Sequence, residues 1–209
     1  MEQAVVEQIV RQVLANLPNQ SIMGIPAGVS NRHIHISSEH MEALFGRGYS
    51  LTKDKELKQV GEFAAKETVT LVGPKGVLAK VRILGPVRKI TQIEIARTDG
   101  FILGVVPPVR DSGQLEDSPG IVVVGPKGAV NLPQGVICAA RHIHMPEADA
   151  VRFKVADGDR VTVAVPGMRG GTFANVLVRV HPNFRLEFHI DTDEANAVEL
   201  KNGDLVTLA

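Results

Sequence analysis

Two short histidine pairs carry the clearest chemical signal in the sequence. The segment 32–36, RHIHI, recurs at 141–145 as RHIHM. In an extended strand, side chains two residues apart project from the same face, about 7 Å apart at Cα. Two imidazoles placed in this way can close on one zinc ion, so two such pairs at equivalent repeat positions predict two metal sites. The paired residues are His33 with His35 and His142 with His144.

A catalytic zinc site usually has a third protein ligand and an open position. Alignment of the two halves places Glu94, in the sequence IEI, against His189, in the sequence FHI. Each is a titratable side chain between apolar neighbours. Burial of such a side chain is unfavourable unless it has a partner of opposite charge or a hydrogen-bond partner, and coordination of a metal ion would supply that partner. Packing of the halves about a pseudo-twofold axis would bring two ions together. The predicted ligand sets are His33, His35 and Glu94 for one ion and His142, His144 and His189 for the other.

Five arginines near these segments are candidates for binding an anion: Arg32, Arg82, Arg88, Arg97 and Arg141. Arg88 follows a Gly-Pro-Val turn just before the segment that contains Glu94, so its guanidinium could reach an anion held at the metals. A planar, bidentate donor is the group that suits phosphate recognition.

The segments around these motifs predict a mainly β fold. Short β-branched runs, each bounded by Gly, Pro, Asn or Asp, indicate strands. The phrase Val-Gly-Pro-Lys-Gly occurs at 72–76 and 124–128 and predicts hairpin turns. We therefore expect two tandem, pseudo-symmetric β-barrel domains with short helices, an arrangement that hides most sheet edges. The predicted strands include 69–72, 79–84, 121–124, 161–165 and 176–180.

The two halves differ in length between their ligand motifs. Glu94 follows His33 by 61 residues, whereas His189 follows His142 by 47. The 14 additional residues fit an extra charged loop between about residues 47 and 66 of the first half. The predicted organisation is an N-terminal helix and linker at 1–24, a first barrel half at 25–118 and a second at 119–209.

Residues 1–17 predict an amphipathic helix, because valine, isoleucine and leucine recur at spacing four. A Pro-Asn-Gln-Ser break at 18–21 separates this helix from the first strand, so we expect an independent interaction helix. Acidic residues near the start argue against a secretory signal or a mitochondrial presequence.

Composition excludes several classes of protein. The 209 residues include 23 basic and 23 acidic side chains, which argues against a general nucleic-acid binder. No apolar run approaches the roughly 20 residues of a membrane span. The single cysteine, Cys138, excludes an intramolecular disulfide and fits a reducing, cytoplasmic location. Its apolar neighbours predict a buried structural thiol rather than a nucleophile.

These motifs, in this order, resemble the PduL-type phosphate propanoyltransferase (phosphotransacylase) family. The resemblance runs from about residue 25 to the C-terminus and includes no large gap. The segments that carry it are 29–37 (VSNRHIHIS), 70–76 (TLVGPKG), 85–94 (GPVRKITQIE), 140–145 (ARHIHM) and 189–196 (HIDTDEAN).

The resemblance implies two β-barrel domains, two zinc ions on the ligand sets given above, and reversible exchange of the CoA of a short-chain acyl-CoA for inorganic phosphate, yielding an acyl phosphate. It implies that Arg88 contacts phosphate. Some similar proteins are cargo of bacterial microcompartments and carry a targeting helix similar to residues 1–17. We also expect a homo-oligomer. The positions that match the family's CoA pocket are Ser30, Lys55, Arg82, Leu84 and Asn196.

Two other classes of function remain open from the sequence. A dinuclear zinc hydrolase would use similar ligands to activate water. A non-catalytic zinc-binding assembly protein would instead be expected to close each site with four protein ligands. Dependence of acyl-CoA turnover on phosphate separates the first alternative from acyl transfer, and three ligands with an open position disfavour the second.

Overall fold

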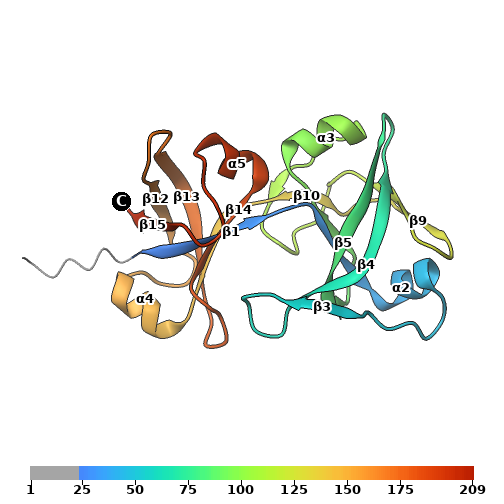
Figure 1. Cartoon of the computed structure of the whole chain (residues 1–209), viewed down its shortest axis with the longest axis horizontal. Helices are drawn as coiled ribbons and strands as arrows, with labels where there is room; N and C mark the ends of the chain where they lie inside the picture. Colours follow the sequence, from blue (N-terminus) through green and yellow to red (C-terminus); the bar gives the residue numbers. More distant parts are fainter. Residues whose placement is uncertain (1–23) are drawn as a thin grey trace, which may run out of the picture.

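The computed structural model describes residues 24–209, which form two β units side by side (Figure 1). One unit is a closed barrel with the strand order β1-β14-β11-β13-β12-β15. Its strands are β1 (Ile25–Ser30), β11 (His142–Met145), β12 (Arg160–Val165), β13 (Gly171–Val180), β14 (Glu187–Asp191) and β15 (Leu205–Leu208).

The other unit is a curled sheet that stays open, with the order β7-β10-β6-β2-β5-β4-β8-β9 and β3 paired to β4. The prediction of a mainly β chain with barrel architecture is confirmed, one unit being closed and the other open. The strands of the sheet are β2 (His33–Ser37), β3 (Lys53–Glu56), β4 (Phe63–Val72), β5 (Val77–Arg88), β6 (Gln92–Glu94), β7 (Val109–Arg110), β8 (Ile121–Val124), β9 (Ala129–Leu132) and β10 (Val136–Ala139).

Short helices cover the ends of the two units, with α2 and α3 on the open sheet and α4 and α5 on the barrel (Figure 1). Within residues 24–209, no helix has the length and apolar character needed to cross a membrane. The predicted helix at 1–17 lies outside the described residues and stays a prediction. The described helices are α2 (Ser38–Phe45), α3 (Arg97–Leu103), α4 (Glu147–Phe153) and α5 (Thr192–Ala197).

The two units exchange strands. β1 precedes β2 in the chain but pairs with β14 in the barrel, and β10 precedes β11 but pairs with β6 in the open sheet. Both strands cross between the units in Figure 1. Strand pairing therefore crosses the boundary at residues 118 and 119 between the predicted halves. Each histidine-pair strand consequently begins where one unit meets the other.

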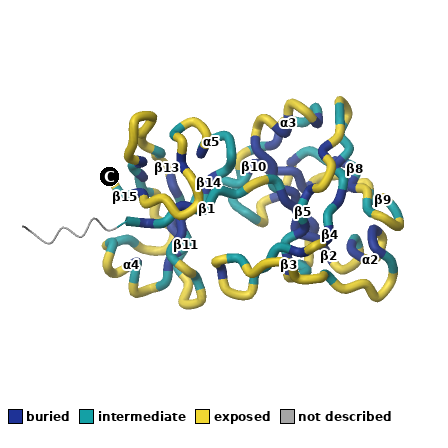
Figure 2. The backbone as a smooth tube through the Cα atoms, in the orientation of Figure 1, coloured by how far each residue is buried: buried dark blue, intermediate teal, exposed yellow. Residues whose placement is uncertain are grey.

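Each unit has its own hydrophobic core (Figure 2). Ile34 and Ile143, the residues between the histidines of each pair, are fully buried in these two cores. Because alternate residues of a strand face opposite sides, burial of the isoleucine turns its two histidine neighbours to the other face. The apolar residue of each His-Ile-His motif therefore fixes the direction of the imidazoles.

Candidate active site

Strand register places the predicted third ligands opposite the first histidine of each pair. His33 on β2 lies across from Glu94 on β6 in an antiparallel pairing. His142 on β11 lies across from His189 on β14 in the equivalent pairing. The two halves thus build the same antiparallel strand pairing around each group of candidate ligands.

The first ligand cluster is His33, His35 and Glu94. The Nε2 atom of His33 lies 3.4 Å from one Glu94 carboxylate oxygen, and the Nε2 atom of His35 lies 3.8 Å from the other. Both histidines are buried. The ligand atoms of all three residues lie within 4.8 Å of one another, which is the spread that a single bound ion can bridge.

The second ligand cluster is His142, His144 and His189, whose ligand atoms also lie within 4.8 Å of one another. The His142 and His189 rings stack at a centroid distance of 4.9 Å, and His144 meets His189 edge-on at 4.7 Å. Three imidazoles that converge in this way would repel one another if all were protonated, so the arrangement disfavours protonation of His142 and His144.

The hydrogen bonds of the histidines fit metal ligands. His33 Nδ1 donates to the carbonyl of Asn31 at 2.8 Å, and His142 Nδ1 donates to that of Ala140 at 2.9 Å. Such bonds fix the tautomer and leave Nε2 with a free lone pair, as in known metal sites. The Nδ1 atoms of His35 and His144 are buried without a hydrogen-bond partner. Unpartnered buried nitrogens are uncommon, and a bound ion would explain them.

The protonation states also fit cation binding, which needs neutral imidazole and ionised carboxylate. Burial, reinforced by the nearby His33 and Arg88, lowers the pKa of His35 to about 3. Burial and the neighbouring His189 lower the pKa of His142 to about 4 and that of His144 to about 2. Burial acts to raise the pKa of Glu94, but the adjacent histidines outweigh it and the net shift is downward.

Sequence reasoning missed two ion pairs that anchor the clusters. Arg32 contacts Asp99 on α3 through two nitrogens, at 2.8 and 3.1 Å. Arg141 contacts Glu194 on α5 at 2.5 Å. Each arginine directly precedes a histidine pair, and each acid lies five residues beyond the third ligand of its half. That shared spacing was visible in the repeat and could have identified both pairs.

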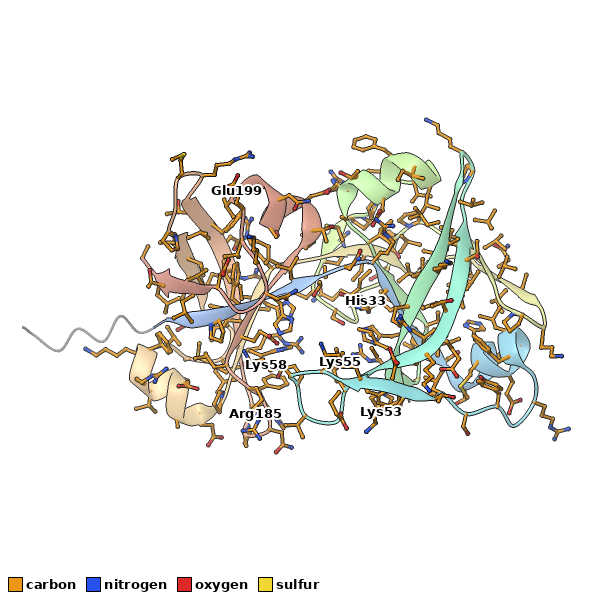
Figure 3. All side chains as sticks on the ribbon, in the orientation of Figure 1. His33, Lys53, Lys55, Lys58, Arg185 and Glu199 are labelled. Atoms are coloured by element: carbon orange, nitrogen blue, oxygen red, sulfur yellow. The ribbon has the colours of Figure 1, made fainter. Side chains whose placement is uncertain are left out.

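One cavity of about 900 Å³ joins the two clusters. All six candidate ligands line it, and so do Arg88, Arg82, Leu84 and Ser30. The other two predicted CoA-contacting residues, Lys55 and Asn196, are exposed and are not among the lining residues. Figure 3 shows Lys55 on β3, at the edge of the space between the two units. The structure thus gathers most of the predicted site into one chamber formed by both units.

Four arginines line the cavity, Arg32, Arg82, Arg88 and Arg179, and two of them, Arg88 and Arg82, belong to the predicted site. Arg88, at the end of β5, donates to Glu62 at 3.1 Å and keeps its other N–H groups for further partners. Arg82 donates to the Ala65 carbonyl at 2.7 Å, which ties its side chain to the neighbouring strand β4. Because Arg88 also acts electrostatically on His35, its charge lies close to the first cluster.

Cys138 has the properties of a structural thiol. It is buried on β10 and its Sγ contacts Asp191 at 3.3 Å. Burial and the Asp191 carboxylate raise the pKa of the thiol to about 12, which keeps it protonated. A protonated, buried thiol is a poor nucleophile, in agreement with the sequence-based interpretation.

Comparison with known proteins shows the family to which the chain belongs. A profile of the phosphate propanoyltransferase family matches residues 26–201. A phosphate propanoyltransferase of Thermotoga maritima is 61% identical over 184 residues, covering 88% of each chain. Proteins of the same description from Salmonella typhimurium and Rhodopseudomonas palustris are 50% and 48% identical, covering 97% and 100% of this chain and 95% and 98% of theirs.

These matches show that the protein is an enzyme of the acyltransferase class. More particularly, the chain belongs to the phosphate propanoyltransferase family, as the sequence motifs indicated. Its activity is that of a phosphate acyltransferase, with acyl-CoA and phosphate as the substrates that the family implies.

Proposed function

We propose that the enzyme converts short-chain acyl-CoA, propanoyl-CoA or acetyl-CoA, and phosphate into acyl phosphate and CoA, reversibly, with two zinc ions per chain. The observation that carries this proposal is the single cavity lined by both ligand clusters and by Arg88. One chamber would therefore receive the acyl thioester, the phosphate and the ions together.

The ligand clusters have the donors that zinc prefers. His33, His35 and Glu94 would hold one ion and leave a coordination position open. His142, His144 and His189 would hold the other. When bound, zinc would act as a Lewis acid on oxygen atoms of phosphate and of the thioester carbonyl.

Arg88 would bind and orient the phosphate. Its guanidinium lies at the cavity wall and is held from one side by Glu62, so the remaining N–H groups can donate to phosphate oxygens. A phosphate oxygen then adds to the thioester carbonyl carbon, a C–O bond forms and the C–S bond breaks. The CoA thiolate leaves and takes up a proton. Correct orientation of the two reactants lowers the entropic part of the barrier.

Direct transfer agrees with the side chains of the cavity. Cys138 is the only cysteine of the chain, is not among the residues that line this cavity and has a raised pKa. The cavity offers Ser30, Arg82 and Leu84 along the wall where the sequence resemblance places CoA. Lys55 and Asn196, which lie outside the lining, would contact CoA only where it extends beyond the cavity.

A coupled assay tests this proposal. The metal-loaded protein, given propanoyl-CoA or acetyl-CoA, should release CoA in proportion to acyl phosphate formed, and only with phosphate present. The ratio of the two kcat/KM values would give the acyl preference. CoA release at an equal rate without phosphate would instead establish the dinuclear hydrolase. Metal analysis of the same sample should give about two zinc ions per chain.

We propose that residues 1–17 direct the enzyme to a bacterial microcompartment through shell or cargo proteins, since their sequence predicts an apolar helical face. Deletion of residues 1–17 should leave kcat and KM within about twofold of the full chain, because the predicted helix precedes the described units. Co-localisation with shell proteins, measured by fluorescence of tagged chains, should fall. An unfolded truncated protein would contradict the idea of an independent helix.

A further inference from the structure

The extra segment of the first half reaches across to the barrel. The longer connection between α2 and β4 contains β3 and a loop. We call this loop, residues 57–62, the strap. The barrel has a shorter connection at the equivalent place, between α4 and β12. Leu57, Lys58, Gln59, Val60 and Glu62 of the strap all line the cavity. Figure 3 shows Lys58 near Arg185 of the barrel, at the place where the two units meet.

Gln59 joins the strap to the barrel. Gln59 is only 5% exposed, although its neighbours Lys58 and Val60 are exposed. Its Nε2 donates to the carbonyl of Arg185 at 3.0 Å, and its Oε1 accepts from the backbone N–H of the same residue at 3.1 Å. The amide therefore pairs with both backbone groups of Arg185, as a neighbouring strand would. A third contact runs from Nε2 to Glu187 at 3.3 Å.

The strap carries charged side chains to both sides of the site. Glu62, at its end, holds Arg88 at 3.1 Å. Lys58 lies 3.6 Å from Glu187. The other oxygen of Glu187 lies 3.1 Å from His189 Nε2, at an ion-pair distance without the alignment of a hydrogen bond. One end of the strap thus acts on the predicted phosphate-binding arginine and the other acts on the second ligand cluster.

We propose that Gln59 is a positioning residue: by holding the strap on the barrel, it sets the place of Arg88 through Glu62. The inference rests on the proposed function, because it concerns the placement of Arg88, the residue that would bind phosphate in that function. Without Gln59, the backbone groups of Arg185 and the carboxylate of Glu187 lose a buried partner, which favours release of the strap.

Gln59→Ala should therefore weaken phosphate use while the ligand clusters stay complete. In metal-loaded full-length protein, the KM for phosphate should rise about tenfold, which is the effect of losing one or two buried hydrogen bonds, with kcat changed by less than about threefold. Zinc content should stay at the value of the unsubstituted chain. Gln134→Ala is the matched control, since Gln134 is an exposed glutamine outside the cavity lining.

Hydrogen exchange provides a readout that does not depend on activity. The Arg185 N–H donates to Gln59 Oε1, so its exchange should accelerate in Gln59→Ala and not in Gln134→Ala. An Arg185 amide that exchanges at the same rate in both variants would overturn the proposal. If the unsubstituted chain makes no acyl phosphate, the proposed function is wrong. The exchange rate of the Arg185 amide still shows whether Gln59 holds the strap on the barrel.

A double-substitution cycle tests the route through Arg88. If Gln59 acts on phosphate by placing Arg88, Gln59→Ala should change kcat/KM for phosphate by less than about twofold in an Arg88→Ala background. A merely structural role would give the full, roughly tenfold loss in both backgrounds. Additive losses would therefore reject Gln59 as a positioning residue for Arg88.

Discussion

His144→Ala is expected to reduce bound zinc from about two ions to about one per chain and to lower kcat/KM for the acyl-CoA by more than about 100-fold. Among residues 24–209, His144 belongs to a cluster of three candidate ligands, so its loss leaves two. Its neutral form is secured by burial, which lowers its pKa to about 2, so the side chain is ready to bind a cation at neutral pH. Elemental analysis and steady-state kinetics of the same preparation measure both effects.

A second histidine provides the control for this substitution. His40 lies on α2, where its Nδ1 contacts Thr91 at 2.7 Å, and it is not among the residues that line the cavity. His40→Ala should keep the zinc content of the unsubstituted chain. Full zinc content in His144→Ala would show that the second cluster does not hold the ion in the way proposed.

The grouping of the candidate ligands could be derived from the sequence because it follows from local rules. A histidine pair in a strand fixes a common face, and the repeat then identifies Glu94 and His189 as equivalent positions. The structure brings these residues together through antiparallel pairing of β2 with β6 and of β11 with β14. That they bind zinc stays a prediction, supported by the orphaned Nδ1 atoms of His35 and His144.

The exchange of β1 and β10 between the units could not be derived in the same way. Both are short apolar segments, and their patterns define a strand without defining its neighbours. Whether β1 pairs with β14 or stays with β2 depends on contacts between residues more than 150 positions apart. The closure of one sheet and the opening of the other likewise depend on pairing across the whole chain.

The strap shows a similar limit. The sequence indicated an additional charged loop between about residues 47 and 66. Nothing in its composition distinguishes Gln59 from other polar loop residues, because the partner, Arg185, lies 126 residues farther along the chain. Lys55 was selected by resemblance alone, and its place on the exposed strand β3 reflects the same lack of local information.

Arg88→Ala is expected to lower kcat/KM for phosphate by about 30- to 1,000-fold while both zinc ions stay bound, since a lost charge-assisted bidentate contact is worth about 2–4 kcal/mol in the transition state. The guanidinium contacts Glu62 and the cavity but is no member of either ligand cluster. Metal content should therefore match that of the unsubstituted chain. The measurement is phosphate-dependent CoA release, together with elemental analysis.

Two further variants show whether charge or geometry is responsible. Arg88→Lys keeps a positive charge but lacks the planar fork, so it should recover only part of the lost kcat/KM. Arg169→Ala removes an arginine that is exposed and outside the cavity lining, and it should leave phosphate kinetics unchanged. Because Arg88 is held by Glu62 before phosphate arrives, the fork is already oriented and little side-chain entropy is lost on binding. Near-normal phosphate kinetics in Arg88→Ala would show that Arg88 pairs with Glu62 and does not bind phosphate.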